Sequence, residues 1–466
     1  MARLPTVSLS DLTLRLQVSG PLTAVELAAV GRVDRSRVSR LFTDAGEERG
    51  VVQIGAARRA RYALRRRVRA AGDRWPIHRL DATGRAHEWA QWEAFHGGYR
   101  LLWAGQQPDW ARLMVDEDGW IDGMPFFVGD LRPQGFVGRS IGLRVGSGLG
   151  LPTDIGRWGD DETIMFLQAE GSDLPGDLVV GESPLRRALA EQMESDQVVD
   201  SGEVDLVYPR LAASAMETGL PGSSAGGEQP KFLTRVTRSS DSEESCAVIV
   251  KFSPPLESQA GQRWADLLAA EGHALVVLVE AGEAMGGSRV FDAGGRRFLE
   301  APRFDRVGDF GRRGVVSLAA LEGTMENTPS SDWGNLTAEL AEAGLVDSAS
   351  VQTVLRRAAL GELIGNSDMH SGNLAFWLDD GGPLQVAPTY DMLPMLWAPA
   401  AGGELVPRRF APRPPTPTQA ESWATAAGWA VNFWGRVAAD SMISEDFRSI
   451  AEQAGEQVEN LLRRFG

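Results

Sequence analysis

A short polar segment between two apolar runs, "LIGNSDMHSGNLAFW" (363–377), constrains the fold of this chain more than any other feature. The apolar run before it has helical spacing, and the run after it is typical of a strand. Gly, Asn, Ser and Asp dominate the segment itself, and a simple turn would explain them. The presence of Asp368, His370 and Asn373 in one loop between two buried elements also fits a catalytic loop. Other parts of the chain must decide between the two interpretations.

The spacing of the carboxylate and amide residues favours the catalytic interpretation. Asp368 and Asn373 are five residues apart, which is the separation of the catalytic aspartate and the metal-binding asparagine in protein kinases. Eighteen residues later, "APTYDMLP" places Asp391 after an apolar stretch that we expect to be a strand. Mg²⁺ prefers oxygen ligands. We therefore predict that Asp368 is the catalytic residue and that Asn373 and Asp391 bind the metal.

Lysine is almost absent from the chain, which has 47 Lys and Arg residues but only Lys231 and Lys251 as lysines. Because a compact ammonium and a guanidinium are not interchangeable, the two lysines indicate positions that need a point charge. Lys251 lies near the end of the predicted strand "CAVIVKF" (246–252), where kinases place a phosphate-binding lysine. A predicted helix follows, and either Asp266 or Glu271 could pair with Lys251.

A glycine-rich segment, "GLPGSSAGGEQPKFLTRV" (219–236), precedes that strand and continues into a predicted strand of its own. The segment is not a P-loop, because G-x-x-x-x-G-K-[ST] is absent. Most segments of this composition are only loops, but their backbone N–H groups can also enclose phosphate oxygens. We predict nucleotide contacts at Ser224, Ala225, Gly226, Gly227 and Lys231.

The segment "RRFLEAPRFDRVG" (296–308) is predicted to be a strand followed by a polar hinge between two lobes. Arg303 and Asp305 could instead form a surface ion pair, but their order in the chain favours the hinge, which could offer backbone groups to adenine. Glycine loop, strand lysine, hinge, Asp…Asn and a second Asp follow one another as in a kinase. This order predicts an α+β, bilobal protein-kinase-like fold.

The N-terminal head, residues 1–72, has the opposite charge to the rest of the chain. It holds 14 Arg and six Asp or Glu, a net charge of +8. The remainder carries a net charge of −24, so the whole chain has −16. A basic region on an acidic chain suggests an anionic partner. A helix is predicted near 8–18, and a second one begins at the capping box of Thr23 and Glu26.

A third predicted helix begins after Asp34, and its apolar residues share one face. Two predicted strands, "VVQI" and "RYAL", then resemble the wing of a winged helix-turn-helix. An arginine-rich helix bundle is the alternative, but helix, turn, wing and charge together favour duplex DNA as the partner. The predicted DNA contacts are Arg35, Ser36, Arg37 and Arg40 on the helix, with Arg58 and Arg59 at the tip of the wing.

The remaining composition limits the class of protein. The 466 residues suit two or three domains, which we place at 1–72, 73–304 and 305–466. No apolar run of about 18 residues is present, no signal-peptide pattern begins the chain, and one cysteine excludes an internal disulfide. We expect a cytoplasmic protein with no membrane partner. An apolar strand is predicted within 124–139, and helices are predicted at 418–440 and 443–465.

Six stretches resemble the HipA family of serine/threonine kinases, toxins of bacterial toxin–antitoxin systems. The long form with a DNA-binding head resembles the HipH/YjjJ subgroup in particular. Three features depart from the family. Many members have Lys at the position of Gly372. An extra residue precedes Lys231, and Pro302 occupies a position in the hinge. The stretches are "FFVGDLRPQGFVGR", "SSAGGEQPKF", "VIVKF", "APRFDR", "GNSDMHSGNLAF" and "PTYDMLP".

The resemblance implies ATP and Mg²⁺ as cofactors and the roles already given to Asp368, Asn373 and Asp391. It also implies that Lys251 contacts ATP phosphates, that His370 lines the nucleotide site and that Ser223 can be autophosphorylated. At the hinge, it implies nucleotide contacts by Arg303, Phe304 and Asp305. The implied substrate is a protein such as an aminoacyl-tRNA synthetase, and a separate antitoxin is a further implied partner. Two other functions stay open: a DNA-binding regulator whose kinase fold only senses nucleotide, and a small-molecule kinase.

Overall fold

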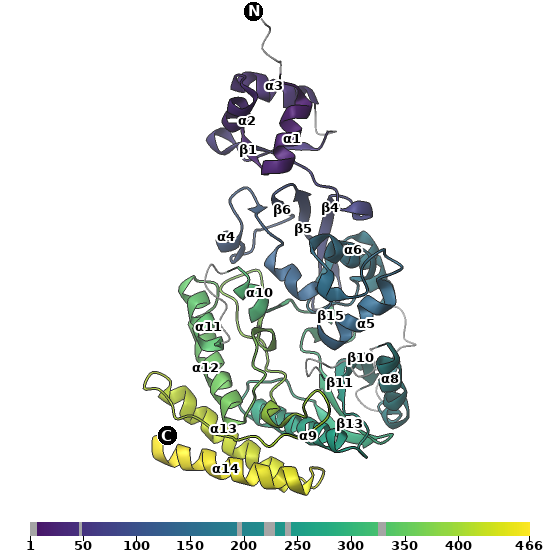
Figure 1. The fold of residues 1–466 in the computed structure, drawn as a ribbon, viewed down its shortest axis with the longest axis vertical. Coiled ribbons are helices and arrows are strands. Elements are labelled where there is room, and N and C mark those ends of the chain that lie inside the picture. Colours follow the sequence, from purple (N-terminus) through teal and green to yellow (C-terminus); the bar gives the residue numbers. More distant parts are fainter. Residues whose placement is uncertain (1–6, 46–48, 193–197, 219–228, 238–243, 325–331) are drawn as a thin grey trace, which may run out of the picture.

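The computed structural model of the chain is elongated, with the head at one end and the two longest C-terminal helices at the other (Figure 1). Between them lie a tryptophan-rich sheet, a second sheet that carries both lysines, and a helical region. The structure describes all residues except 1–6, 46–48, 193–197, 219–228, 238–243 and 325–331.

The head consists of three helices and a three-stranded antiparallel sheet in the order β1-β3-β2. The predicted capping box of Thr23 and Glu26 begins α2, and the side chain of Asp34 accepts the backbone N–H of Arg37 at 3.0 Å. Leucine and aromatic side chains of all three helices form a small separate core. The elements are α1 (Leu9–Ser19), β1 (Leu22–Thr23), α2 (Ala24–Gly31), α3 (Arg35–Ala45), β2 (Val51–Ile54), η2 (Ala57–Arg59), β3 (Arg61–Leu64) and η3 (Arg69–Ala71); the predicted helices and both predicted strands are confirmed.

The middle region, residues 73–192, is built on a five-stranded antiparallel sheet in the order β7-β6-β5-β4-β8, and its tryptophans pack edge to face. The strand predicted within 124–139 is wrong. Phe127, Val128 and Leu131 are buried at helical spacing, and the segment forms two helices instead. The elements are β4 (Arg74–Leu80), β5 (Ala86–Phe95), β6 (Gly98–Trp103), α4 (Ala111–Met114), β7 (Trp120–Ile121), η4 (Phe126–Leu131), α5 (Gly135–Val145), η5 (Ile155–Arg157), α6 (Asp160–Glu170), β8 (Leu178–Val180) and α7 (Glu182–Glu191).

The second five-stranded sheet, which we call the lysine sheet, has the order β12-β13-β11-β10-β9. Because side chains alternate along a strand, Phe232 and Val250 face α8 on one side of the sheet. Leu299, opposite Lys251 in the register, packs on the other side against α9. The elements are β9 (Val198–Val199), α8 (Val204–Thr218), β10 (Lys231–Thr237), β11 (Ser245–Phe252), α9 (Gln259–Glu280), β12 (Arg289–Ala293) and β13 (Arg296–Pro302); the strands and helix predicted here are confirmed.

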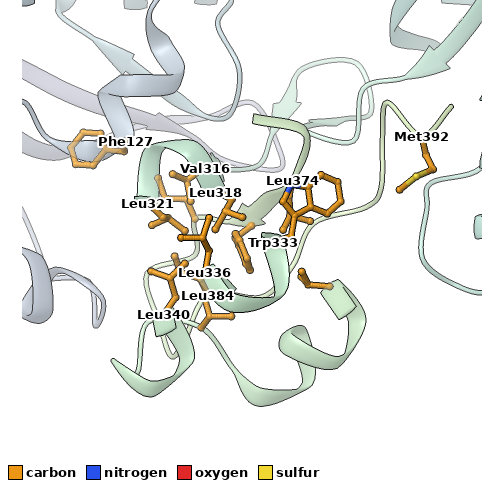
Figure 2. Packing of buried hydrophobic residues seen from close by; sticks show 14 of the residues in the cluster. Phe127, Val316, Leu318, Leu321, Trp333, Leu336, Leu340, Leu374, Leu384 and Met392 are labelled. Atoms are coloured by element: carbon orange, nitrogen blue, oxygen red, sulfur yellow. The ribbon is translucent and has the colours of Figure 1, made fainter. Parts of the chain in front are cut away.

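The remaining described residues form two small two-stranded sheets and four longer helices. The helices predicted at 418–440 and 443–465 are confirmed as α13 and α14. One large core joins this part to the middle region, and Figure 2 shows a portion of it that includes Leu374 and Met392. No helix in the described ranges has the length and apolar character needed to span a bilayer. The elements are β14 (Arg306–Val307), β15 (Gly311–Arg312), β16 (Val315–Ser317), α10 (Leu318–Glu322), α11 (Trp333–Glu342), α12 (Ser348–Leu363), η6 (Ser371–Asn373), β17 (Ala375–Trp377), η7 (Met395–Trp397), α13 (Ala420–Ala439) and α14 (Glu445–Phe465).

Candidate functional site

The loop of residues 365–373, which we call the catalytic loop after its predicted role, joins α12 to β17. It begins at Gly365, whose φ is +73°. The ring of Trp397 lies 2.8 Å from the position that a Cβ would take there, so glycine is required at this turn. At the other end of the loop, Leu374 is 2% exposed. The loop is therefore held at both ends by the core.

Hydrogen bonds inside the catalytic loop attach the side chains of Asn373 and Asn366 to the backbone of Asp368. The amide nitrogen of Asn373 donates to the backbone carbonyl of Asp368 at 2.9 Å. The backbone N–H of Asp368 donates to the side-chain oxygen of Asn366 at 3.1 Å. Asn373 is buried and Asp368 is exposed. Since the nitrogen of Asn373 is occupied, its Oδ1 is the atom that remains available to a cation.

Asp391 lies in a strained backbone conformation beside this loop. Its φ of +52° belongs to the left-handed region, which is costly for a residue other than glycine and is often found at functional sites. Asn366 donates from its side chain to the backbone carbonyl of Asp391 at 3.4 Å, and Met392 is fully buried. Sequence reasoning missed Asn366, which links the two predicted metal-binding segments.

The strand predicted to lead into Asp391 is wrong. In the described residues just before Asp391 the structure has two isolated bridges, Leu384 with Val346 and Val386 with Phe376. Pro388 has no N–H to give to a sheet, and the neighbouring polar backbone groups bond to other elements, as described below. Asp391, which follows this segment, is nevertheless held by the hydrogen bond from Asn366 to its carbonyl.

Lys251 connects the lysine sheet to both α9 and Asp391. Its Nζ lies 2.6 Å from Oε1 of Glu271 and also pairs with the carboxylate of Asp391. The choice between Asp266 and Glu271 is thereby decided for Glu271. Asp266 instead accepts hydrogen bonds from the backbone N–H and hydroxyl of Ser444, at 2.9 and 2.6 Å.

Charge and burial act in opposite directions in this cluster. Burial favours the neutral form of Lys251, but the carboxylates of Asp391 and Glu271 outweigh it and raise the pKa of the lysine. Burial would raise the pKa of Asp391, yet Lys251, and then Lys231, hold that pKa well below its ordinary value. For Glu271 burial prevails, and its pKa is raised despite Lys251. His370 also lowers the pKa of Asp391, so it lies within electrostatic reach of the cluster.

The two lysines are direct cross-strand partners, with Lys231 on β10 opposite Lys251 on β11. Such partners point to the same face of a sheet. Lys231 also borders a cavity of about 530 Å³ between the middle region and the lysine sheet, a volume typical of small-ligand sites. Its apolar lining includes Phe136, Ile141, Phe166, Leu174 and Leu233.

The predicted hinge is held by a group of charges in which Arg303 and Asp305 are buried and Asp173 is exposed. Arg303 donates to the carboxylate of Asp305 at 3.1 and 2.9 Å and pairs with Asp173 at 3.3 Å. The backbone N–H of Gly176 donates to Asp305 at 2.8 Å. The alternative of an ion pair is thus confirmed, although the pair is buried and not at the surface. These side chains attach the hinge to the middle region, and their contact with nucleotide stays a prediction.

Phe304 points the other way, into an aromatic group beside the catalytic loop. Its ring centroid lies 5.7 Å from that of Tyr390 and 5.6 Å from that of Trp377. The hydroxyl of Tyr390 donates to the carbonyl of Gly372 at 2.7 Å. Gly372 is where the family often has lysine, and here a Cβ would lie 2.9 Å from the ring of His370. The glycine therefore allows His370 to accept the backbone N–H of Gly372 at 3.1 Å.

The donor set fits Mg²⁺ in part. Asn373 and Asp391 offer hard oxygen ligands. Across the part of the chain that the structure describes, no cluster of three His, Cys, Asp or Glu side chains is arranged to hold a metal by itself. Two protein oxygens complemented by phosphate oxygens and water are typical of Mg²⁺ bound together with a nucleotide. The predicted glycine-loop contacts and the predicted phosphorylation site lie outside the described residues, namely Ser223, Ser224, Ala225, Gly226 and Gly227.

In the head, Arg35, Ser36 and Arg40 on α3 are exposed, and Arg37 is half-buried. The charge at the tip of the predicted wing differs from our expectation. Arg58 and Arg59 are both exposed, but Arg59 forms an ion pair with Glu117 of the middle region. This pairing was not predictable from local sequence patterns, because the two residues are 58 positions apart. The guanidinium of Arg59 is therefore partly neutralised, in contrast to our expectation of a free cationic tip.

Comparison with known proteins places these features in a family. Residues 71–189 match the family described as "YjjJ-like toxin, middle domain", and residues 223–462 match "HipA-like C-terminal domain". Toxin YjjJ of Escherichia coli (strain K12) is 37% identical over 465 residues, which cover 98% of this chain and 100% of that toxin.

Solved structures of low identity also align. The HipA of Shewanella oneidensis MR-1, solved with HipB and its operator DNA, is 16% identical, with a TM-score of 0.48 over 84% of this chain and 97% of that one. The Helicobacter pylori proinflammatory kinase CtkA is 12% identical, with a TM-score of 0.34 over 49% of this chain and 90% of that one. The family models and the relative in E. coli, which spans nearly the whole chain, establish that this protein belongs to the HipA family, among the YjjJ-like toxins.

Proposed function

We propose that the chain is an ATP- and Mg²⁺-dependent serine/threonine protein kinase of the HipA toxin type. The observation that carries the proposal is the position of Lys251. Its ammonium joins Glu271 on α9 to Asp391 beside the catalytic loop. In protein kinases a strand lysine paired with a helix glutamate, together with a metal-binding aspartate, must be in place for phosphoryl transfer.

In this proposal the γ-phosphoryl group of ATP passes to a serine or threonine hydroxyl, and ADP leaves. The exposed carboxylate of Asp368 orients the acceptor hydroxyl and takes its proton. Lys251 and Lys231 contact the phosphates, and the oxygens of Asn373 and Asp391 bind the metal. Mg²⁺, when bound, neutralises the charge of the phosphate oxygens.

The nucleotide base is proposed to lie between the hinge and the middle region. Phe304 offers an aromatic surface next to the catalytic loop, and the cavity beside Lys231 has room for a small ligand. His370, whose charge acts on Asp391, is kept as a residue of the nucleotide site in the proposal. The backbone of the glycine loop, Ser224 to Gly227, and the side chains of Arg303 and Asp305 are kept as nucleotide contacts in the proposal.

The acceptor is proposed to be a protein, with an aminoacyl-tRNA synthetase as the candidate that the family suggests, and Ser223 as a site of autophosphorylation. Such a substrate implies action in the cytoplasm. A separate antitoxin is a further proposed partner. Residues 1–72 are proposed to be a winged helix-turn-helix that binds duplex DNA, with residues 73–304 and 305–466 as the two kinase lobes. The exposed arginines of α3 support the DNA contact.

The proposal is tested with the purified chain, γ-labelled ATP and Mg²⁺, with and without a cell lysate. Label on a lysate protein is the expected result. Nucleotide binding without any transfer would favour a DNA-binding regulator that senses nucleotide. Label found only on small molecules of the lysate would favour a small-molecule kinase.

A further inference from the structure

Glu283 lies at the junction of three elements that carry the proposed active-site residues. It follows α9, which holds Glu271, and it is 7% exposed. Its carboxylate accepts hydrogen bonds from Arg356 and Arg357 on α12, the helix that leads into the catalytic loop. Its backbone carbonyl bonds to the segment that leads to Asp391. A single buried residue thus joins α9, α12 and the metal-binding segment.

Arg357 makes the connection with all three of its nitrogens. Nε donates to Oε2 of Glu283 at 3.0 Å, Nη2 donates to the carbonyl of Glu283 at 3.0 Å, and Nη1 donates to the carbonyl of Ala387 at 2.6 Å. Only 4% of this side chain is exposed. Because a guanidinium presents its donors in a fixed plane, Arg357 fixes Ala387 relative to Glu283.

Thr389 supplies the second attachment, two residues before Asp391. Its backbone N–H and its hydroxyl both donate to the carbonyl of Glu283, each at 2.9 Å. Ala387 and Thr389 are therefore held on either side of Pro388. Beyond them the chain enters the left-handed conformation of Asp391, and such a conformation persists only where its surroundings determine it.

We propose that Glu283, Arg357 and Thr389 form a clamp that positions Asp391 as a metal ligand. The residues of the clamp are positioning residues, because they act on Asp391 through the backbone before it. Arg357 donates to the carbonyl of Ala387, and Thr389 donates to the carbonyl of Glu283. The inference rests on the proposed Mg²⁺–ATP binding and adds the residues that set its geometry. Groups that support a metal ligand typically change metal affinity by about 10–100-fold when they are removed.

The chain offers a matched control in the adjacent residue. Arg356 pairs with the same carboxylate, at 2.6 Å from Oε1 of Glu283, but its other side-chain hydrogen bond goes to Thr353 and none goes to the segment before Asp391. Its side chain is 26% exposed. R356Q and R357Q therefore remove the same charge from the same glutamate, and only the second releases Ala387.

The experiment measures ATP binding to the full-length chain by calorimetry, in Mg²⁺ and in EDTA. The readout is the gain in ATP affinity that Mg²⁺ provides. We expect R357Q to reduce this gain by about 10–100-fold and R356Q to change it by less than about fivefold, as for a partly exposed ion pair. R357K retains the charge but not the planar set of donors, and it should behave like R357Q.

T389V keeps the clamp testable if the buried arginine variants fail to fold. Valine has nearly the shape of threonine and leaves no buried charge, so only the hydroxyl bond to Glu283 is lost. One hydrogen bond predicts a reduction of the Mg²⁺-dependent gain by about 2–10-fold. ATP affinity in EDTA should stay at the wild-type value in all four variants.

The outcomes separate the clamp from the proposed function. Absence of any Mg²⁺-dependent gain in the wild-type chain would overturn both. A normal gain in the wild type, with R357Q equal to R356Q and T389V equal to wild type, would overturn the clamp alone. An equal loss of ATP affinity with and without Mg²⁺ would also overturn it, because the defect would then be a general one of folding.

Discussion

Lys251 is the residue whose removal tests the energetics of the site most fully. Substitution by methionine keeps an unbranched apolar side chain and removes the ammonium. Glu271, with 3% of its side chain exposed, and Asp391, with 27%, then lose the cation that they share. Breaking a buried ion pair from one side costs about 3–5 kcal/mol, because a charge stays buried without compensation. Since Asp391 is partly exposed, we expect a loss near the lower limit, about 3 kcal/mol.

The pH dependence of this stability loss follows from the directions of the pKa shifts of Asp391, Lys251 and Glu271. In the wild type the pKa of Asp391 is lowered below 3.8, so its contribution to stability is present above that pH and is lost at lower pH. The pKa of Lys251 is raised, so the ammonium stays charged through pH 8. In K251M neither carboxylate has this cation, and protonation of Glu271, whose pKa is already raised, relieves the repulsion. The stability difference between wild type and variant should therefore narrow as the pH falls from 8 to 5.

Two variants serve as controls for this effect. K231M removes the cross-strand lysine, which is half-buried, and should cost less than about 1 kcal/mol. K251M/E271L replaces the buried pair with apolar side chains, and such replacements are often neutral or stabilising. The double variant should regain stability relative to K251M without regaining ATP affinity.

The assay is urea denaturation followed by tryptophan fluorescence at pH 5 and pH 8, with ATP binding measured in parallel. The transition that includes the lysine sheet should move to lower urea in K251M and return toward the wild-type midpoint in the double variant. A K251M chain as stable as wild type at pH 8 would show that the ammonium of Lys251 does not stabilise the two carboxylates. So would a double variant that is less stable than K251M.

Two further predictions concern the metal and the head. D391A should lose most of the Mg²⁺-dependent part of ATP affinity, and calorimetry that shows this part unchanged would make Asp391 a structural residue. R37A in the full chain should weaken binding to duplex DNA and flatten the dependence of log affinity on log salt by about one unit if one phosphate contact is lost. R59A should flatten it less, because Arg59 already pairs with Glu117; fluorescence anisotropy over a salt series that showed equal effects would contradict this.

Local patterns in the sequence predicted much of the fold. The capping box of Thr23 and Glu26, the strands around Lys231 and Lys251, and the two C-terminal helices all depend on short-range spacing. The segment 124–139 was assigned wrongly because a short apolar run fits a strand and a buried helix equally well. The strand before Asp391 was assigned wrongly because Pro388 and the clamp take its backbone groups out of any sheet.

The candidate site was predictable where its chemistry is rare in the chain. Two lysines among many arginines marked positions that the structure makes direct partners across β10 and β11. The residues that hold the site were not predictable in this way. Asn366, Glu283 and Arg357 act through bonds to distant backbone atoms, and one glutamate or arginine among many carries no local signal. The choice of Glu271 over Asp266 was not predictable either, because it depends on which face of α9 lies toward Lys251.

Asp368 is the proposed catalytic residue of phosphoryl transfer by this chain. The most direct measurement compares D368N with wild type in the transfer of labelled phosphate from ATP to a lysate protein, with S367A as an exposed neighbouring control. Loss of a positioned base typically costs about 10²–10⁴-fold in rate, so D368N should fall by that factor and bind Mg²⁺–ATP as wild type does, whereas S367A should stay near the wild-type rate. Transfer by D368N at the wild-type rate would contradict the account.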